Sequence, residues 1–431
     1  MIEIIKNIII SFQREIKDIE VFQRQLSIPL ESGVFKAITI FGPRRAGKTF
    51  FLFSIAKEYI KTYNSVENIV YINFEDNRLI SLTADKLDII TSAFGQLYPD
   101  IKPVLFLDEI QNINGWSKWV RKLVDQKFTV YVTGSNANLL SREIASELRG
   151  RTFSFLLLPL SFHEYLSHHA ITLSDQNIYY TPARNKIHAL LNKYLTHGGF
   201  PEVLKLKNFS TELLLQDYLQ SIIYRDITER YKIRNTHVLK RMINFCLQNY
   251  ASVFSVNKFY NDLKSQQIKI SKDTLYEYMD YLEEAVFVFQ LPKYSSSFMK
   301  TEKELKKIYL CDLGYTSLYS HKTDKGKRFE NFIFLELYRI YGNDMFYYTE
   351  GAECDFVIGR QPKYLIQASY TLDRNASTFN RELRASVNTM EHFNLQELYL
   401  VTFDESEKIE MNNGTIHIMN YIEFLKKFIE S

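Results

Sequence analysis

Cysteine is scarce in this chain, whose 431 residues include only Cys246, Cys311 and Cys354. Their spacing fits no metal-binding motif, and an odd, sparse set does not form a disulfide framework. We therefore expect three buried, uncrosslinked side chains and a reducing, cytoplasmic location. The nine histidines are scattered, and none forms a H-x-x-x-H pair with other ligands nearby, so no zinc site is predicted.

Long apolar runs are also missing. No stretch reaches the roughly 18 uncharged apolar residues that a membrane-spanning helix needs, so no membrane partner is expected. The apolar run near the N-terminus is short, is interrupted by Lys6, and is followed by mixed charge without a cleavage site. This pattern predicts an amphipathic helix rather than a signal peptide.

An excess of one charge is absent as well, because 53 lysines and arginines face 50 acidic residues, for a net charge of +3. That balance neither requires nor excludes nucleic acid. The length predicts about two to four domains. A hydrophobic fraction of 46% and a charged fraction of 24% are typical of folded proteins with sizeable cores.

Short apolar runs alternate with helical patterns in the first third of the chain. Strand-like runs occupy residues 36–41, 68–76, 103–110 and 128–136, and residues 49–63 have helical periodicity. Strands that alternate with helices indicate an α/β fold with a parallel sheet covered on both faces. After about residue 160 the pattern becomes mainly helical.

A complete phosphate-binding motif, GPRRAGKT, follows the first strand and opens the first helix. The loop amides and the helix N-terminus would face phosphate oxygens, Lys48 would reach the β- and γ-phosphates, and the Thr49 hydroxyl would bind Mg²⁺. The predicted nucleotide-binding residues are Gly42, Pro43, Arg44, Arg45, Ala46, Gly47, Lys48, Thr49, Phe50 and, from a later strand end, Ser135.

Two acidic residues, Asp108 and Glu109, end the apolar strand VLFLD. The carboxyl ends of parallel strands form the edge where ligands of such sheets bind. We expect Asp108 to hold Mg²⁺ and Glu109 to orient and deprotonate the attacking water. Glu75 and Asp76 follow an earlier strand, where a solvated strand end is the simpler interpretation.

Further polar residues follow the next strand. Ser135 or Asn136 would reach the γ-phosphate or the water, although a strand-end turn is the alternative. Arg149 or Arg151, in the segment ELRGR, would serve as an arginine finger in cis or in trans, with a salt-bridged surface arginine as the alternative. A trans role would require a homo-oligomer.

These segments together resemble the AAA-plus ATPases, and among them an archaeal and bacterial group fused to a C-terminal domain of unknown function. The resemblance runs from about residue 30 to about 400 and rests on GPRRAGKT, INFED, LFLDEIQNINGW, VTGSNANLLSREIASELRGR, LPLSFHEYL, GGFPEV and YRDITERYKIRN. It implies ATP as the nucleotide and a five-stranded ATPase core at residues 1–160. A helical lid at 161–234, a winged helix-turn-helix at 235–310 and a restriction-endonuclease-like domain at 311–431 would follow.

Residues 255–291 read as two helices and a strand, which is the pattern of a helix-turn-helix that can enter the DNA major groove. The second helix is acidic, however, and phosphates would repel it. The attractive charges are Lys269, Lys272, Lys300, Lys303, Lys306 and Lys307, and the acids are Asp273, Glu277, Asp280, Glu283 and Glu284. DNA binding and protein docking both stay open for this segment.

The last domain resembles restriction-type nucleases, which use a helix Glu, a strand Asp and a Glu-x-Lys on the next strand to bind Mg²⁺ and polarise water. Glu330 and Asp355 occupy the first two positions, but Gln367 and Ser369 replace the last two. A neutral amide is a weak Mg²⁺ ligand and a hydroxyl carries no charge, so we expect this fold without nuclease activity.

The leading hypothesis is an ATPase that uses Mg²⁺ and couples its nucleotide state to DNA binding through the C-terminal half. The alternative is a nucleotide-gated switch that binds a protein partner with negligible turnover. An active ATP-dependent nuclease is a third hypothesis, and it depends on Glu330 and Asp355 alone.

Overall fold

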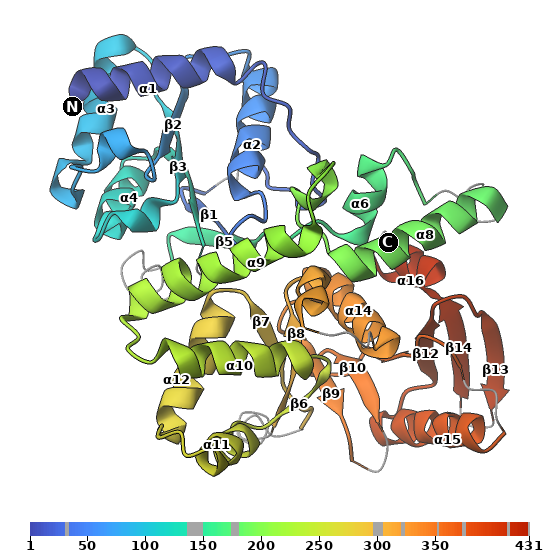
Figure 1. Ribbon diagram of the computed structural model, residues 1–431. Helices are drawn as coiled ribbons and strands as arrows, with labels where there is room; N and C mark the ends of the chain where they lie inside the picture. Colours follow the sequence, from blue (N-terminus) through green and yellow to red (C-terminus); the bar gives the residue numbers. More distant parts are fainter. Residues whose placement is uncertain are drawn as a thin grey trace. The chain divides into compact units, whose positions relative to one another are not determined.

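The computed structural model describes residues 1–30, 34–135, 150–173, 181–295, 305–319, 324–350, 353–372, 376–411 and 414–429. The chain divides into two compact units (Figure 1). The first unit comprises Met1–Leu160 together with the short segments Phe200–Glu202 and Glu284–Val286, and the second unit comprises the remainder.

A five-stranded parallel sheet forms the centre of the first unit, in the order β2-β3-β4-β1-β5. Its strands are β1 (Ala37–Phe41), β2 (Ile69–Asn73), β3 (Val104–Asp108), β4 (Thr129–Gly134) and β5 (Thr152–Leu156). The predicted α/β class and parallel sheet are confirmed. In this order, β4 lies between the strand that precedes the phosphate-binding motif and the strand that ends in Asp108.

Helices cover both faces of this sheet (Figure 1). Val70 and Ile72 of β2 pack on one face with α3 (Asp88–Leu97) and α4 (Trp116–Asp125). Ile69 and Tyr71 point to the opposite face, toward α2 (Lys48–Tyr63). Successive strand residues alternate between faces, so a strand covered on both sides must be apolar throughout, as these are.

The N-terminal segment forms the predicted amphipathic helix, α1 (Ile2–Glu15), which buries Ile5, Ile9 and Phe12. Three short 3₁₀ helices complete the first unit: η1 (Asn77–Leu79), η2 (Ala84–Lys86) and η3 (Ile110–Asn112). Within the described residues, no helix is both long enough and apolar enough to cross a membrane.

The second unit begins with helices. A capping box, in which Ser161 and Glu164 bond each other's backbone amides, starts α6 (Phe162–His168). The following elements are α8 (Thr181–His197), η5 (Val203–Lys205), α9 (Thr211–Ser221) and η6 (Ile222–Glu229), a π-helix that continues α9. The Gly-Gly-Phe-Pro turn directly follows the end of α8.

Three helices and a small sheet follow. The helices are α10 (Thr236–Gln248), α11 (Val256–Ser265) and α12 (Lys272–Glu284). The antiparallel sheet, in the order β6-β8-β7, contains β6 (Ser252–Phe254), β7 (Val288–Leu291) and β8 (Lys306–Leu310). The two helices and strand predicted at 255–291 are present, and the identity of this segment as a winged helix stays a prediction.

A six-stranded mixed sheet in the order β13-β14-β12-β11-β10-β9 ends the chain. Its strands are β9 (Met345–Tyr348), β10 (Cys354–Ile358), β11 (Tyr364–Ala368), β12 (Glu397–Thr402), β13 (Glu407–Met411) and β14 (Gly414–Asn420). The remaining elements are η7 (Leu313–Leu318), α14 (Lys325–Tyr341), α15 (Ala376–Phe393) and α16 (Tyr421–Phe428). The side chain of Asn331 on α14 accepts from the amide of Leu310 and donates to its carbonyl oxygen. These two bonds attach α14 to β8 of the small sheet.

Candidate nucleotide site

The phosphate-binding loop connects β1 to α2, and its backbone requires glycine at two positions. A Cβ at Gly42 would lie 2.0 Å from the carbonyl oxygen of Leu157, which is far inside contact distance. Gly47, directly before α2, has a φ of +95°, in the left-handed region that glycine adopts without strain. The sequence therefore places glycine where the loop has no room for a side chain or turns sharply.

Lys48 is buried, and its side chain points into the loop. Its Nζ donates to the carbonyl oxygens of Gly42 and Pro43, each at 3.2 Å. The same Nζ lies 3.5 Å from Oε1 of Glu109. The structure thus brings the predicted phosphate-binding lysine and the predicted catalytic acid together.

The Thr49 hydroxyl donates to Oδ2 of Asp108 at 2.7 Å, and the Tyr71 hydroxyl donates to the same oxygen at 2.8 Å. Thr133 donates to the other carboxylate oxygen. Burial, and then the negative charge of Glu109, raise the pKa of Asp108 above its ordinary value. Hydroxyl and carboxylate oxygens are the ligands that Mg²⁺ prefers. Thr49 and Asp108 therefore fit the predicted metal.

Glu109 is buried and has a φ of +52°, which is unusual for a residue with a side chain. Burial alone would raise the pKa of its carboxyl, but the Lys48 ammonium, a hydrogen bond from Gln111 and the Arg44 charge outweigh burial and lower this pKa. Glu109 is therefore ionised at neutral pH, which is the state that a proton acceptor needs.

Two residues that the sequence did not single out complete the site. Thr133 lies on β4, between β1 and β3, and its hydroxyl also accepts the Glu109 amide at 2.9 Å. Arg24 donates to the carbonyl oxygens of Ala46 at 3.1 Å and Leu158 at 2.6 Å, so it ties the loop to the chain after β5. The polar end of the strand predicted at 128–136 was a sequence signal for Thr133, but the residues predicted from it were Ser135 and Asn136, which follow it.

The other predicted ligand residues lie around this centre. Ser135 is buried directly after β4, and Phe50 is 47% exposed. Arg44 pairs with Glu75 at 3.2 Å, so Glu75 contacts the loop as well as solvent. Arg45 pairs with Glu202 at 3.3 Å. Asp76 instead caps η1. Asn136 and Arg149 lie outside the described residues.

Arg151 is not brought to the nucleotide site. Its carbonyl accepts the amide of Ala37, where β1 begins, and its side chain pairs with Asp125 at 2.8 Å. The loop follows the other end of β1, and five strand residues span roughly 16 Å. Arg151 therefore lies at the opposite end of the strands from the phosphate-binding loop, and a cis role for this residue is wrong.

A second polar cluster lies in the second unit. The Lys307 ammonium is 2.8 Å from Oδ1 of Asp355 and 3.3 Å from Oε1 of Glu330, and the Tyr309 hydroxyl donates to Glu330 at 2.7 Å. Gln367 uses its Oε1 to accept the Asp355 amide at 2.9 Å. The sequence missed this lysine because it comes from β8, far from the strand that carries Ser369.

This cluster also corrects the expectation for DNA contacts, because Lys307 is only 4% exposed and cannot reach a phosphate backbone. Lys300 and Lys303 lie outside the described residues. The acids of α12 have the predicted unfavourable sign, and Asp273, Glu277 and Asp280 are exposed. The second predicted helix is therefore poorly suited to contact DNA.

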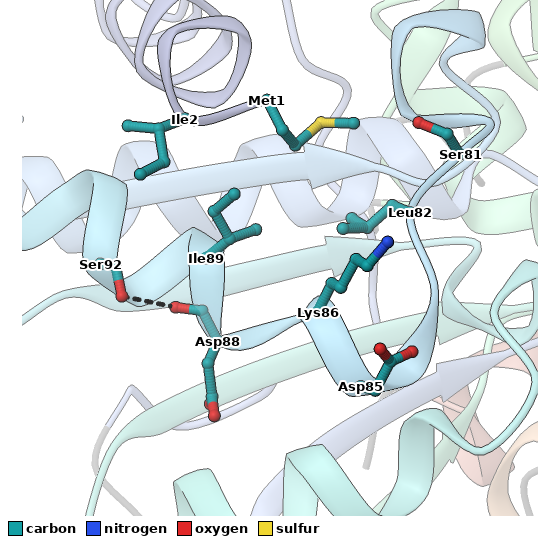
Figure 2. Close-up of a pocket in the computed structure, with 9 residues that line it drawn as sticks. All are labelled: Met1, Ile2, Ser81, Leu82, Asp85, Lys86, Asp88, Ile89 and Ser92. Atoms are coloured by element: carbon teal, nitrogen blue, oxygen red, sulfur yellow. Dashed lines mark hydrogen bonds between the residues drawn. The ribbon is translucent and has the colours of Figure 1, made fainter.

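Figure 2 shows a pocket elsewhere in the first unit, at the start of α1 and beside η2 and α3. It shares no residue with the phosphate-binding loop. Its lining residues are Met1, Ile2, Ser81, Leu82, Asp85, Lys86, Asp88, Ile89 and Ser92. Over the described ranges, no group of three or more His, Cys, Asp or Glu side chains is arranged to hold a metal ion. All three cysteines are free and buried, as expected.

Comparisons with known proteins bear on the family and domains of this chain. A family model described as an AAA domain matches residues 34–166, and one described as a domain of unknown function (DUF8612) matches residues 188–324. The uncharacterized protein MJ1544 of Methanocaldococcus jannaschii is 34% identical over 423 residues, covering 95% of this chain and 91% of the relative. An uncharacterized protein of Haemophilus influenzae is 32% identical over 354 residues, covering 78% of this chain and 83% of the relative.

Two solved structures are more distant. PCH-2 of C. elegans is 13% identical with a TM-score of 0.28, covering 51% of this chain and 60% of that chain. AMPPCP-bound DnaA from Aquifex aeolicus is 14% identical with a TM-score of 0.23, covering 57% of this chain and 81% of that chain. The AAA domain is assigned from the family-model match over residues 34–166, and the family of the chain is assigned from its two relatives.

Proposed function

The chain belongs to the same family as MJ1544 and the Haemophilus influenzae relative and contains an AAA domain, and we propose that it is an Mg²⁺-dependent ATPase whose nucleotide state controls DNA binding by its C-terminal half. The observation that carries the ATPase proposal is the convergence of Lys48, Thr49, Asp108 and Glu109 at one edge of the parallel sheet.

Each residue has a distinct role in this proposal. The loop amides and Lys48 bind the phosphates of ATP, and Thr49 and Asp108 hold Mg²⁺, which supplies positive charge to the phosphate oxygens. Glu109 accepts the proton of the attacking water, because its carboxyl is ionised and lies beside the loop. Thr133 holds the two acids in register through its bonds to both.

Several parts of the proposal go further. Ser135 or Asn136 senses the γ-phosphate, and Arg149 or Arg151 acts in trans on a neighbouring copy in a homo-oligomer. The residues at 161–234 form a lid, those at 235–310 a winged helix-turn-helix, and those at 311–431 a nuclease-like domain. The protein is cytoplasmic, which suits three free, buried cysteines.

The test is phosphate release from ATP, with and without duplex DNA, for the wild type, Lys48→Ala and Glu109→Gln. We expect turnover that rises with DNA, loss of ATP binding in Lys48→Ala, and retained binding without turnover in Glu109→Gln. Lys363→Ala is the matched lysine control, because Lys363 is exposed on the second unit. Unchanged ATP binding by Lys48→Ala would refute the assigned site.

A second candidate function is a nucleotide-gated switch that binds a basic protein surface. The observation that favours it is the exposed acidic side of α12, formed by Asp273, Glu277 and Asp280. Tight ATP binding with negligible turnover and no response to DNA would select this alternative.

We also propose that the C-terminal domain has no nuclease activity. Lys307 already lies between the two carboxylates, and both oxygens of Asp355 are engaged, one by Lys307 and the other by the Ala368 amide. Gln367 bonds the backbone and offers no charge to a metal. Cleavage of plasmid DNA with Mg²⁺ or Mn²⁺, lost in Asp355→Ala, would overturn this proposal.

A further inference from the structure

The charges of the helical segment in the second unit are segregated along the chain. From Arg230 to Asn261 there are six lysines and arginines and no aspartate or glutamate. In contrast, α12 carries five acids and begins with its only basic residue, Lys272. Such separation creates local fields of opposite sign although the whole chain is nearly neutral.

The basic side chains lie on one side of α10 and beside it. His237, Lys240 and Arg241 follow the i, i+3, i+4 spacing of a single helix face. The opposite face is buried, because Leu239, Met242 and Ile243 and their neighbours pack into the core. The apolar side of α10 is therefore covered and its basic side is accessible.

A hydrogen bond and the preceding turn extend this basic side to its neighbours. Arg241 donates to the side chain of Gln266, which caps the end of α11 two residues after Lys264. Lys232 and Arg234 lie in the turn that leads into α10, and both are exposed. We define the α10 basic surface by its five lysines and arginines: Lys232, Arg234, Lys240, Arg241 and Lys264.

These five cations are not neutralised by carboxylates. Across the described ranges, none of them lies within ion-pair distance of an aspartate or glutamate, whereas Arg44, Arg151 and Arg184 are each paired with one. Lys240 bonds the Tyr224 hydroxyl at 2.8 Å, and Arg241 bonds His237 at 3.0 Å, so a tyrosine and a histidine position them. Unneutralised cations placed close together attract a polyanion.

The surroundings favour a duplex over other polyanions. A membrane surface would require an exposed apolar face, and the apolar face of α10 is buried. Single strands require open aromatic rings for base stacking, but Tyr231 is stacked on Tyr281 with centroids 3.8 Å apart, and Lys240 lies 5.0 Å above the Tyr224 ring. Backbone phosphates of a duplex need only placed cations.

We propose that the α10 basic surface binds the phosphate backbone of duplex DNA, and that α12 does not face the DNA. This inference rests on the proposed function and specifies the surface through which its DNA binding occurs. Contact through phosphates alone makes the binding independent of base sequence and strongly dependent on salt.

The experiment measures the affinity of the full-length chain, with ATP and Mg²⁺, for a labelled duplex by fluorescence anisotropy between low and moderate salt. The test variant is Lys232→Gln/Arg234→Gln, because both side chains are exposed and hold no other group in place. The matched control is Lys363→Gln/Lys408→Gln, two exposed lysines of the C-terminal sheet. Melting curves verify that both variants fold.

The expected result is a test variant that binds about tenfold more weakly than the control, with a salt slope smaller by about two, one for each lost phosphate contact. Equal slopes and affinities in the test and control variants, with a wild type that binds DNA, would overturn this inference and leave the proposed function intact. A wild type that does not bind duplex DNA at low salt would instead refute the DNA part of the proposed function. Tighter binding to single strands than to the duplex would also overturn the inference.

Discussion

Replacement of Thr133 by valine tests the claim that one hydroxyl positions both acids of the nucleotide site. Valine has nearly the same shape as threonine, but it cannot donate to Asp108 or accept the Glu109 amide. Thr133 is fully buried, so water cannot replace either bond. Each of the two buried partners left unsatisfied costs about 1–3 kcal/mol, so the first unit should lose roughly 2–6 kcal/mol of stability.

The control for this experiment is Thr39→Val. Thr39 is equally buried on the neighbouring strand β1, and its hydroxyl shares a hydrogen bond of 2.9 Å with that of Thr152. Loss of one neutral hydrogen bond should cost about 1 kcal/mol and leave turnover unchanged. Melting temperature and ATP turnover at saturating ATP are the two measurements.

In Thr133→Val we expect turnover to fall by about tenfold or more, because a loss of 1.4 kcal/mol in transition-state stabilisation is a factor of ten. ATP binding should change less than turnover, since the Thr133 hydroxyl bonds Asp108 and the Glu109 amide rather than Lys48. If Thr133→Val melts and turns over like Thr39→Val, Thr133 does not position the acids and the proposed arrangement is wrong.

Three further predictions follow from other contacts. Gly42→Ala should abolish ATP binding measured by calorimetry, because its Cβ would lie 2.0 Å from the Leu157 oxygen, whereas Gly95→Ala, which meets no atom, should bind normally. Burial raises the pKa of Asp312 to about 7, above its unfolded value, so protonation favours the folded state. The contribution of Asp312 to stability should therefore fall as pH rises from about 4 to about 7, and Asp312→Asn should flatten that part of the melting-temperature profile; an unchanged profile would contradict the assignment. Lys307→Met should destabilise the second unit by about 3–5 kcal/mol because it leaves Asp355 and Glu330 buried without a cation, and Lys307→Met/Asp355→Asn should recover part of the loss in melting temperature.

Local patterns predicted the centre of the molecule well. The strand, glycine-rich turn and helix at residues 36–63 have a sequence signature because their geometry is decided by neighbouring residues. The pairing of Asp108 with Thr49 was also predictable, since parallel strands end at the same edge of a sheet. Neither inference required knowledge of which strands are adjacent.

Residues whose role depends on strand order were missed. Thr133 acts on Asp108 because β4 lies between β1 and β3, and no local pattern determines that order. Lys307 reaches Asp355 from a strand 48 residues earlier, whereas the nuclease pattern places its lysine on the strand that follows Asp355. The position of Arg151 at the end of the sheet away from the loop likewise depends on the pairing of β5 with β1.

The contacts of Gly42 and Arg24 have a mechanical consequence for the chain as a whole. Both connect the phosphate-binding loop to Leu157 and Leu158, and the second unit begins only a few residues later, at Ser161. The loop and the start of the connecting segment therefore share an anchor point. In the proposed ATPase, a nucleotide that moved the loop would also move that anchor, and the covalent backbone would carry this movement toward Ser161.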